Sequence, residues 1–119
     1  EVFIGIEDIE KPGGLLFTDR QLLIASIDQR RAGDVFMVNS ARQPQVEFVC
    51  VPWVDGTGYT MEAAIPWTAF DYQPKEGDLL LFEIAVDDAP PGGDRTRQIW
   101  WNGGSSRDRT NWGLLRLVP

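Results

Sequence analysis

Two stretches in the middle of the chain, residues 59–67 and 79–87, place apolar side chains at every second position. A repeat of two residues is typical of a β-strand that buries one face. The register that keeps Glu62 and Glu83 in water leaves an apolar face on both strands. We therefore expect seven residues to face the core: Tyr59, Met61, Ile65, Leu80, Phe82, Ile84 and Val86.

Pro66 divides these two strands, because proline cannot donate a hydrogen bond to a neighbouring strand. The first strand should end there, and residues 67–70 should form at most one helical turn. Gly77 and Asp78 then turn the chain into the second strand.

The remaining sequence consists of short apolar segments separated by turn residues. The Gly-rich segment 54–58 is a tight connection and predicts an antiparallel hairpin between residues 45–53 and 59–67. Residues 28–34 form a charged turn, and the Gly/Pro-rich residues 88–94 are incompatible with strand or helix. Further strands are expected at residues 2–6, 20–27, 35–39, 97–101 and 112–118.

Eight short strands, without a helical period over ten residues, predict an all-β fold. We expect a single domain, residues 1–119, built as an antiparallel β-sandwich of jelly-roll-like type. The chain begins without Met and inside a predicted strand. The expectation is therefore a fragment that lacks the first strands and any signal peptide of a larger protein.

Charge and composition exclude several classes of function. The net charge is −7 and the 11 basic residues are dispersed, which disfavours nucleic acid and anionic membranes as partners. The absence of histidine removes the commonest general base and transition-metal ligand. Cys50, the only cysteine, shares a predicted strand face with apolar residues and is expected in the core.

Five tryptophans are many for 119 residues, and their exposure decides the functional argument. Trp67 follows the strand-ending proline and Trp112 begins the last strand, so both are expected in the core. Trp100 and Trp101 are neighbours on one strand and point to opposite faces. The pattern makes Trp100 the more exposed of the two, and Trp53 is open to either interpretation.

An exposed indole beside polar loops suits a sugar, because the flat ring covers the apolar C–H face of a pyranose. Nearby carboxylates, amides and guanidinium groups would bond its hydroxyls. The equal alternative is that these rings seal the ends of a small sandwich.

The carboxylates give two weaker hypotheses. Paired acids are what glycoside hydrolysis requires, and Glu62 and Glu83 both fall on outward faces, although such residues are more typical of a solvated surface. Asp87, Asp88 and Asp94 flank the 88–94 loop and offer oxygen ligands for Ca²⁺. With no histidine and one cysteine, this region has no soft ligand for zinc or copper.

Four motifs follow one another between residues 59 and 117, about half of the chain. They are Tyr59 to Trp67 with its Ile65-Pro66-Trp67 end, Gly77-Asp78 before a strand ending in Val86-Asp87-Asp88, Arg97 to Gly103, and Trp112 to Leu117. In order and spacing these motifs resemble the carbohydrate-binding module family 9 group and the wider DOMON-like set.

This resemblance implies a sugar-binding β-sandwich, often attached to xylanases or other glycoside hydrolases, with Ca²⁺ in some members and paired aromatic residues that clamp a terminal sugar. Trp101 falls on the tryptophan of the family's Trp-polar-Gly segment, and Asp87-Asp88 on its Asn/Asp-Asp pair. Two features depart from the family: residues 102–111 contain no aromatic side chain, and the first strands are missing.

The sequence thus predicts a non-catalytic carbohydrate-binding domain of a secreted or periplasmic glycan-processing protein, attached to further domains and binding an oligosaccharide or a polysaccharide such as xylan. The alternative is a structural or interaction domain that has lost the sugar site, and a glycoside hydrolase is a distant third. The predicted ligand-binding residues are Trp101, Trp100, Arg97, Asn102, Asp88 and Trp53.

Overall fold

The computed structural model describes residues 1–10, 12–25, 34–38, 40, 42–90 and 93–119. The described chain is almost entirely β, as predicted, and one short 3-10 helix, η1 (Trp67–Phe70), follows Pro66. None of its helices is long and apolar enough to cross a membrane. The strands are β1 (Val2–Gly5), β2 (Arg20–Ala25), β3 (Asp34–Val38), β4 (Glu47–Pro52), β5 (Tyr59–Ala64), β6 (Leu79–Asp88), β7 (Arg97–Trp100) and β8 (Gly113–Arg116).

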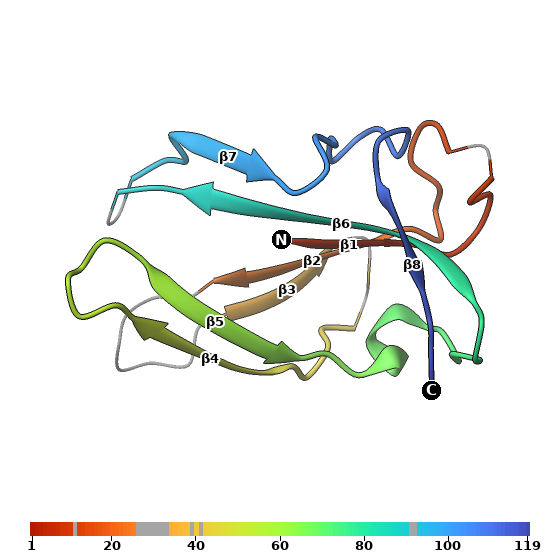
Figure 1. Cartoon of the computed structure of the whole chain (residues 1–119), viewed down its shortest axis with the longest axis horizontal. Coiled ribbons are helices and arrows are strands. Elements are labelled where there is room, and N and C mark those ends of the chain that lie inside the picture. The colour runs from red at the N-terminus through yellow and green to blue at the C-terminus, as the bar shows by residue number, and fades with distance from the viewer. Residues whose placement is uncertain (11, 26–33, 39, 41, 91–92) are drawn as a thin grey trace.

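The strands form two antiparallel sheets, which confirms the predicted sandwich. The larger sheet has the order β3-β2-β1-β6-β7, and β8 also pairs with β6. Strand β6 is long enough for two partners in succession, since β8 pairs with its first half and β7 with its second. The β4–β5 hairpin forms the second layer, seen below the larger sheet in Figure 1.

The β4–β5 hairpin confirms the tight connection predicted at residues 54–58. Pro52 pairs with Tyr59, and the Trp53 N–H donates to the Gly58 carbonyl at 2.8 Å. Gly56 adopts a φ of 71°, a left-handed conformation that favours glycine. Pro66 then keeps an extended backbone and stops β5 from continuing.

One face of the larger sheet, here called the inner face, is turned toward β4–β5 and holds the main core. Its buried residues are Ile4, Leu22, Met37 and Phe70. Val46 and Ile65, which flank the last pair at the open end of the hairpin, and Trp67 pack against them. Trp67 is therefore part of the core, as predicted.

The opposite face, the outer face, is covered by loops. Phe3, Leu81, Ala85 and Trp112 form a second buried cluster there. The loop after β1 and the loop between β7 and β8 lie side by side over it in Figure 1, joined by the Arg109 N–H, which donates to Gly13 O at 2.7 Å. Trp112 is buried, as predicted.

The predicted register of β6 is wrong at Glu83, which is 0% exposed on the outer face. Leu80 is buried and Phe82 half-buried on the inner face, as predicted, whereas Ile84 and Val86 on that face are exposed. The reason is that the loop between β7 and β8 covers Glu83, while the two-stranded hairpin is too narrow to cover the β7 side of the larger sheet.

The outcome on the hairpin is also mixed. Glu62 is exposed and Met61 half-buried, as predicted, but Tyr59, placed in the core from its alternation, is exposed beside the turn of the hairpin, where it pairs with Pro52. Cys50 is half-buried rather than fully buried.

Parts of other predictions lie outside the described residues. These are positions 26–27 of strand 20–27, positions 28–33 of the charged turn, position 39 of strand 35–39, and positions 91–92 of the loop after β6.

Candidate functional site

An open strip of the inner face runs along β6 and β7. Asp88 pairs with Arg97, and Val86 with Ile99. The Trp101 N–H then donates to Ile84 O at 2.9 Å, which extends the pairing by one step. Since alternate residues of a strand share a face, all six side chains lie on the inner face. All six are exposed, and the strip from Arg97 to Trp101 is about 13 Å long at the usual rise of a strand.

Trp101 is the largest exposed group of the strip, at 64% exposure. Its ring meets the Phe82 ring in an edge contact, with centroids 5.9 Å apart and planes at 68°. It also lies over Gly113, where a Cβ would come within 2.9 Å of Trp101 Cζ3. The indole is thus supported along one side and open to solvent on the other.

Polar groups flank this apolar surface. Asp88 and Arg97 lie at the end of the strip that is farther from Trp101. At the other end, Asn102 Nδ2 donates to the Asn111 carbonyl at 2.8 Å, which orients the amide and closes the base of the loop. An apolar plate with charged and amide groups beside it can stack on a ring and bond hydroxyls.

Trp100 lies on the outer face, and the prediction that it is the more exposed of the pair is wrong. Its ring packs against Phe3, with centroids 5.3 Å apart and planes at 32°. The residue is half-buried in the cluster that contains Trp112. The sequence shows only that Trp100 and Trp101 face opposite ways, and the loop that covers the outer face decides which one is exposed.

Trp53 is 53% exposed but belongs to the hairpin. Its Nε1 donates to Thr60 Oγ1 at 3.1 Å, and its ring lies against Gly58. Thr60 pairs with Val51, whose side of the hairpin is turned away from the larger sheet. The structure therefore does not bring Trp53 and Trp101 together on one surface.

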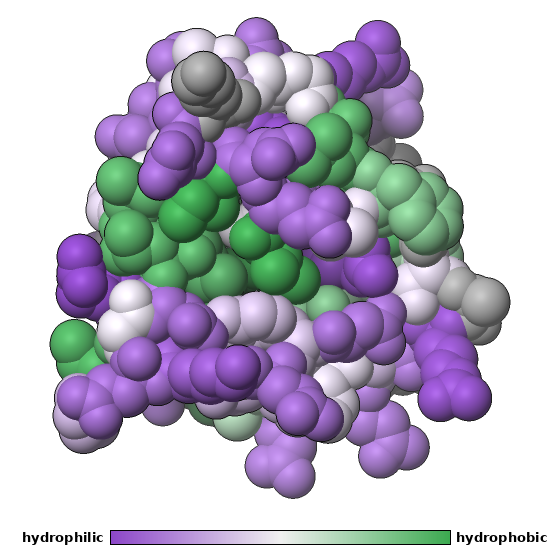
Figure 2. Space-filling view, turned by 90° about the vertical axis from the view of Figure 1, so that its right-hand side faces the viewer, coloured by the Kyte–Doolittle hydropathy of each residue, from purple (hydrophilic) through white to green (hydrophobic). Residues whose placement is uncertain are grey.

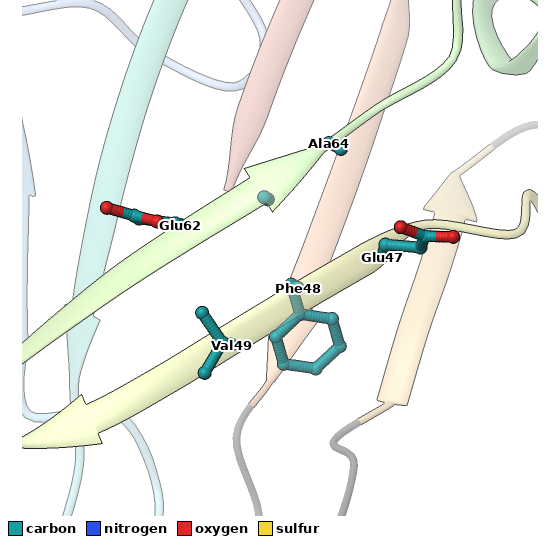
Figure 3. Close-up of a pocket in the computed structure, with 6 residues that line it drawn as sticks. Glu47, Phe48, Val49, Glu62 and Ala64 are labelled. Carbon is teal, nitrogen blue, oxygen red and sulfur yellow. The ribbon is translucent and has the colours of Figure 1, made fainter.

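A hollow of about 450 Å³ lies along the hairpin. It is lined by Glu47, Phe48, Val49, Glu62, Ala63 and Ala64. Figure 3 shows these side chains spread along two paired strands with the larger sheet behind them, so the hollow is shallow and open. Its lining has two carboxylates but neither an indole nor a guanidinium, which suits a sugar less well than the strip around Trp101.

Apolar side chains also gather at the end of the molecule that carries β8. Figure 2 shows them as a patch surrounded by hydrophilic residues. Leu114 of β8 and Val118 beyond it are both exposed. Strand β8 itself, Gly-Leu-Leu-Arg, has no aromatic side chain that could act as the plate that Trp101 provides.

The three aspartates proposed for Ca²⁺ do not form a ligand set. Asp87 and Asp88 are successive strand residues and leave opposite faces of the sheet. Asp87 Oδ1 is 3.1 Å from Arg95 Nη1, and Asp94 is exposed. Within the described ranges, no group of three or more carboxylate, thiol or imidazole side chains could hold a metal ion. Calcium binding here stays an untested prediction that the geometry does not favour.

Comparison with known proteins identifies the domain. The sequence pattern of the family described as "Carbohydrate family 9 binding domain-like" matches residues 26–119. The chain belongs to this family. As a family 9 domain it is a carbohydrate-binding domain, in agreement with the resemblance seen in the motifs.

Two curated relatives share a segment with this family 9 domain. Endo-1,4-beta-xylanase A of Thermoanaerobacterium saccharolyticum is 36% identical over 65 residues, 52% of this chain and 5% of the xylanase. Exoglucanase XynX of Acetivibrio thermocellus is 35% identical over 65 residues, 52% of this chain and 6% of that protein. The chain thus spans a small part of either relative. No solved structure gave a match.

The sequence did not point to the apolar part of the family 9 domain's strip. Ile84 and Val86 were expected in the core, and Ile99 was not singled out. Gly113 and Phe82 support the indole, but neither carried a signal of that role. The one sequence feature that pointed to this surface is the spacing of Ile99 and Trp101, which are two residues apart and therefore lie on one face of the strand.

Proposed function

We propose that this family 9 domain binds an oligosaccharide or a stretch of polysaccharide along the inner face of β6 and β7. The observation that carries the proposal is Trp101, a 64% exposed indole at the end of an exposed apolar strip. The ring would stack on a pyranose, and the strip of about 13 Å has room for more than one sugar unit.

The polar residues at both ends of the strip supply the hydrogen bonds. Arg97 and Asp88 would bond hydroxyls at one end, and Asn102 at the end where Trp101 lies. Sugar binding exchanges bonds to water for bonds to protein, so we expect a modest affinity. A dissociation constant of roughly micromolar to millimolar corresponds to about −8 to −4 kcal/mol.

The role proposed for the domain is binding without catalysis. Hydrolysis of a glycoside needs two carboxyl groups on either side of the bond. Glu83 is fully buried on the outer face, so it cannot act on a substrate together with Glu62 of the hairpin. This argues against the glycoside hydrolase hypothesis.

We further propose that the domain directs a larger enzyme to its substrate. Support comes from the names of the two relatives, a xylanase and an exoglucanase, in which the matching segment is a small part of a long chain. Xylan is the first ligand to test. Since polysaccharides are too large to cross a membrane, we place the protein in the extracellular space or the periplasm.

A structural domain that has lost its sugar site is the second candidate. Two observations favour it: residues 102–111 contain no aromatic side chain, and Trp53 does not face Trp101. The strip then has one aromatic plate instead of a clamp. In that case the exposed strip would be a contact surface for other parts of the protein.

Binding to insoluble xylan and cellulose, followed by a screen of xylo- and cello-oligosaccharides, tests the proposal. We expect retention on at least one polysaccharide and release by its soluble oligosaccharide. Failure to bind any glycan at millimolar concentration would favour the structural domain.

A further inference from the structure

A buried carboxylate lies directly behind the proposed sugar platform. Glu83 stands in β6 between Phe82 and Ile84, and its side chain is 0% exposed on the outer face. Burial of a carboxylate is costly unless hydrogen bonds compensate for the lost water. The hydrogen bonds of the Glu83 carboxylate therefore indicate its structural role.

One oxygen of Glu83 ties β6 to the turn that follows β7. Oε1 accepts from its neighbour's N–H, that of Ile84, at 3.0 Å, and from the Asn102 N–H at 2.9 Å. The preceding N–H in the turn, that of Trp101, donates to Ile84 O. Two successive amides of the turn are thus held by two successive residues of β6.

The other oxygen is enclosed by the same loop. Oε2 has no hydrogen-bond partner in the described parts of the chain. Gly104 packs so closely that a Cβ there would come within 2.8 Å of Oε2 and 3.0 Å of Trp112 Cδ1. The carboxylate is therefore enclosed between the sheet and the loop, with no room for a side chain at position 104.

We infer that Glu83 is a positioning residue, whose carboxylate fixes the turn that presents Trp101 on the inner face. The part of this inference that concerns sugar affinity rests on the proposed function. The carboxylate never meets the ligand, since it lies on the opposite face of the sheet. It acts through the Asn102 amide, and so determines where the indole can lie against Phe82.

The far end of the loop is held by other contacts. Trp112 Nε1 donates to Ser105 O at 3.0 Å, and Asn102 Nδ2 to Asn111 O. Loss of the Glu83 carboxylate should therefore loosen the first turn while the rest of the loop stays in place. A general structural role would instead affect the whole domain.

Glu83→Leu and Glu83→Gln separate these roles, with Glu62→Leu and Glu62→Gln as matched exposed controls. We expect Glu83→Leu to speed hydrogen exchange of the Asn102 amide and to weaken the nuclear Overhauser contacts between Phe82 and Trp101. Its oligosaccharide affinity should fall about fivefold to tenfold, as for one lost hydrogen bond of ordinary net strength. Glu83→Gln keeps a carbonyl acceptor and should stay close to the parent in affinity.

Unchanged Asn102 exchange and an unchanged Phe82–Trp101 contact in folded Glu83→Leu would overturn the inference. If that variant does not fold, Glu83→Gln decides, because a neutral acceptor should move the Asn102 amide proton upfield, and an unmoved resonance overturns the inference. If the parent binds no glycan, the proposed function fails, and the exchange and ring contacts still decide whether Glu83 positions Trp101.

Discussion

Arg109 Nε lies 3.2 Å from Asp19 Oδ2, and the two side chains are only 1% and 5% exposed. The pair joins the two loops that cover the outer face, and Arg109 also donates to the Glu7 carbonyl. A side chain at Gly5 would come 3.0 Å from Arg109 Nη2, so the pair depends on glycine beneath it. Burial raises the pKa of Asp19, and a hydrogen bond from the Leu16 N–H and the charge of Arg109 oppose that shift.

Arg109→Met should strongly destabilise the domain, because it leaves the Asp19 carboxyl buried without its cation. Removing one partner of a buried ion pair costs about 3–5 kcal/mol. Urea unfolding followed by tryptophan fluorescence measures the loss. Arg116→Met, at an exposed arginine of β8, is the control and should change stability by about 0.5 kcal/mol or less. Equal effects of the two substitutions would contradict a stabilising role for the pair.

The hydrogen bond between Tyr72 and Asp78 should make the free energy of unfolding depend on pH. The hydrogen bond that the Tyr72 hydroxyl donates to Asp78 raises the pKa of Tyr72 to about 12. It also lowers the pKa of Asp78, with help from the Lys75 N–H. A raised folded pKa of tyrosine gives stability that is present below pH about 10 and lost as pH rises toward 12. A lowered folded pKa of aspartate gives stability that is present above pH about 4 and lost as pH falls further.

Tyr72→Phe should remove the alkaline dependence and reduce the acid one, since the hydrogen bond from the Lys75 N–H to Asp78 remains. Ultraviolet titration of the phenolate in the parent should show one tyrosine ionising above the ordinary range, and this step should vanish in the variant. Urea unfolding at neutral and alkaline pH should show a smaller loss of stability in Tyr72→Phe than in the parent. A parent whose two tyrosines both ionise in the ordinary range would refute the hydrogen bond.

The support of Trp101 by Gly113 gives a third prediction. Gly113→Ala places a Cβ within 2.9 Å of Trp101 Cζ3 and 3.3 Å of Phe82 O. The indole should swing away, because it is the free end of a side chain and the strand is not. We expect a stability loss of about 1 kcal/mol, altered tryptophan emission and weaker oligosaccharide binding. Gly14→Ala, where no atom lies within 4 Å of the new Cβ, is the control.

Much of the fold could be predicted from local chemistry. Alternation at residues 59–64 and the Gly-rich residues 54–58 predict the β4–β5 hairpin, and Pro66 predicts its end. These signals work because they depend on residues close together in the sequence. They do not show what covers a strand face, and Glu83 was misplaced for that reason.

The candidate site was predictable only in part. Alternation along β7 places Arg97 and Trp101 on one face, and the pairing of Asp88 with Arg97 brings the end of β6 beside them. The exposure of Trp101 rather than Trp100 depends on a distant loop packing over the outer face. The exposure of Ile84 and Val86 depends on how far the hairpin extends, which no local pattern encodes.

Calorimetric titration of the parent, Trp101→Ala and Trp53→Ala with the oligosaccharide found in the screen tests the central claim most directly. We predict micromolar to millimolar binding by the parent and by Trp53→Ala. Trp101→Ala should remain folded and lose affinity by at least about tenfold, because it loses the aromatic platform. Binding by folded Trp101→Ala as tight as that of the parent would show that the sugar does not bind at this strip.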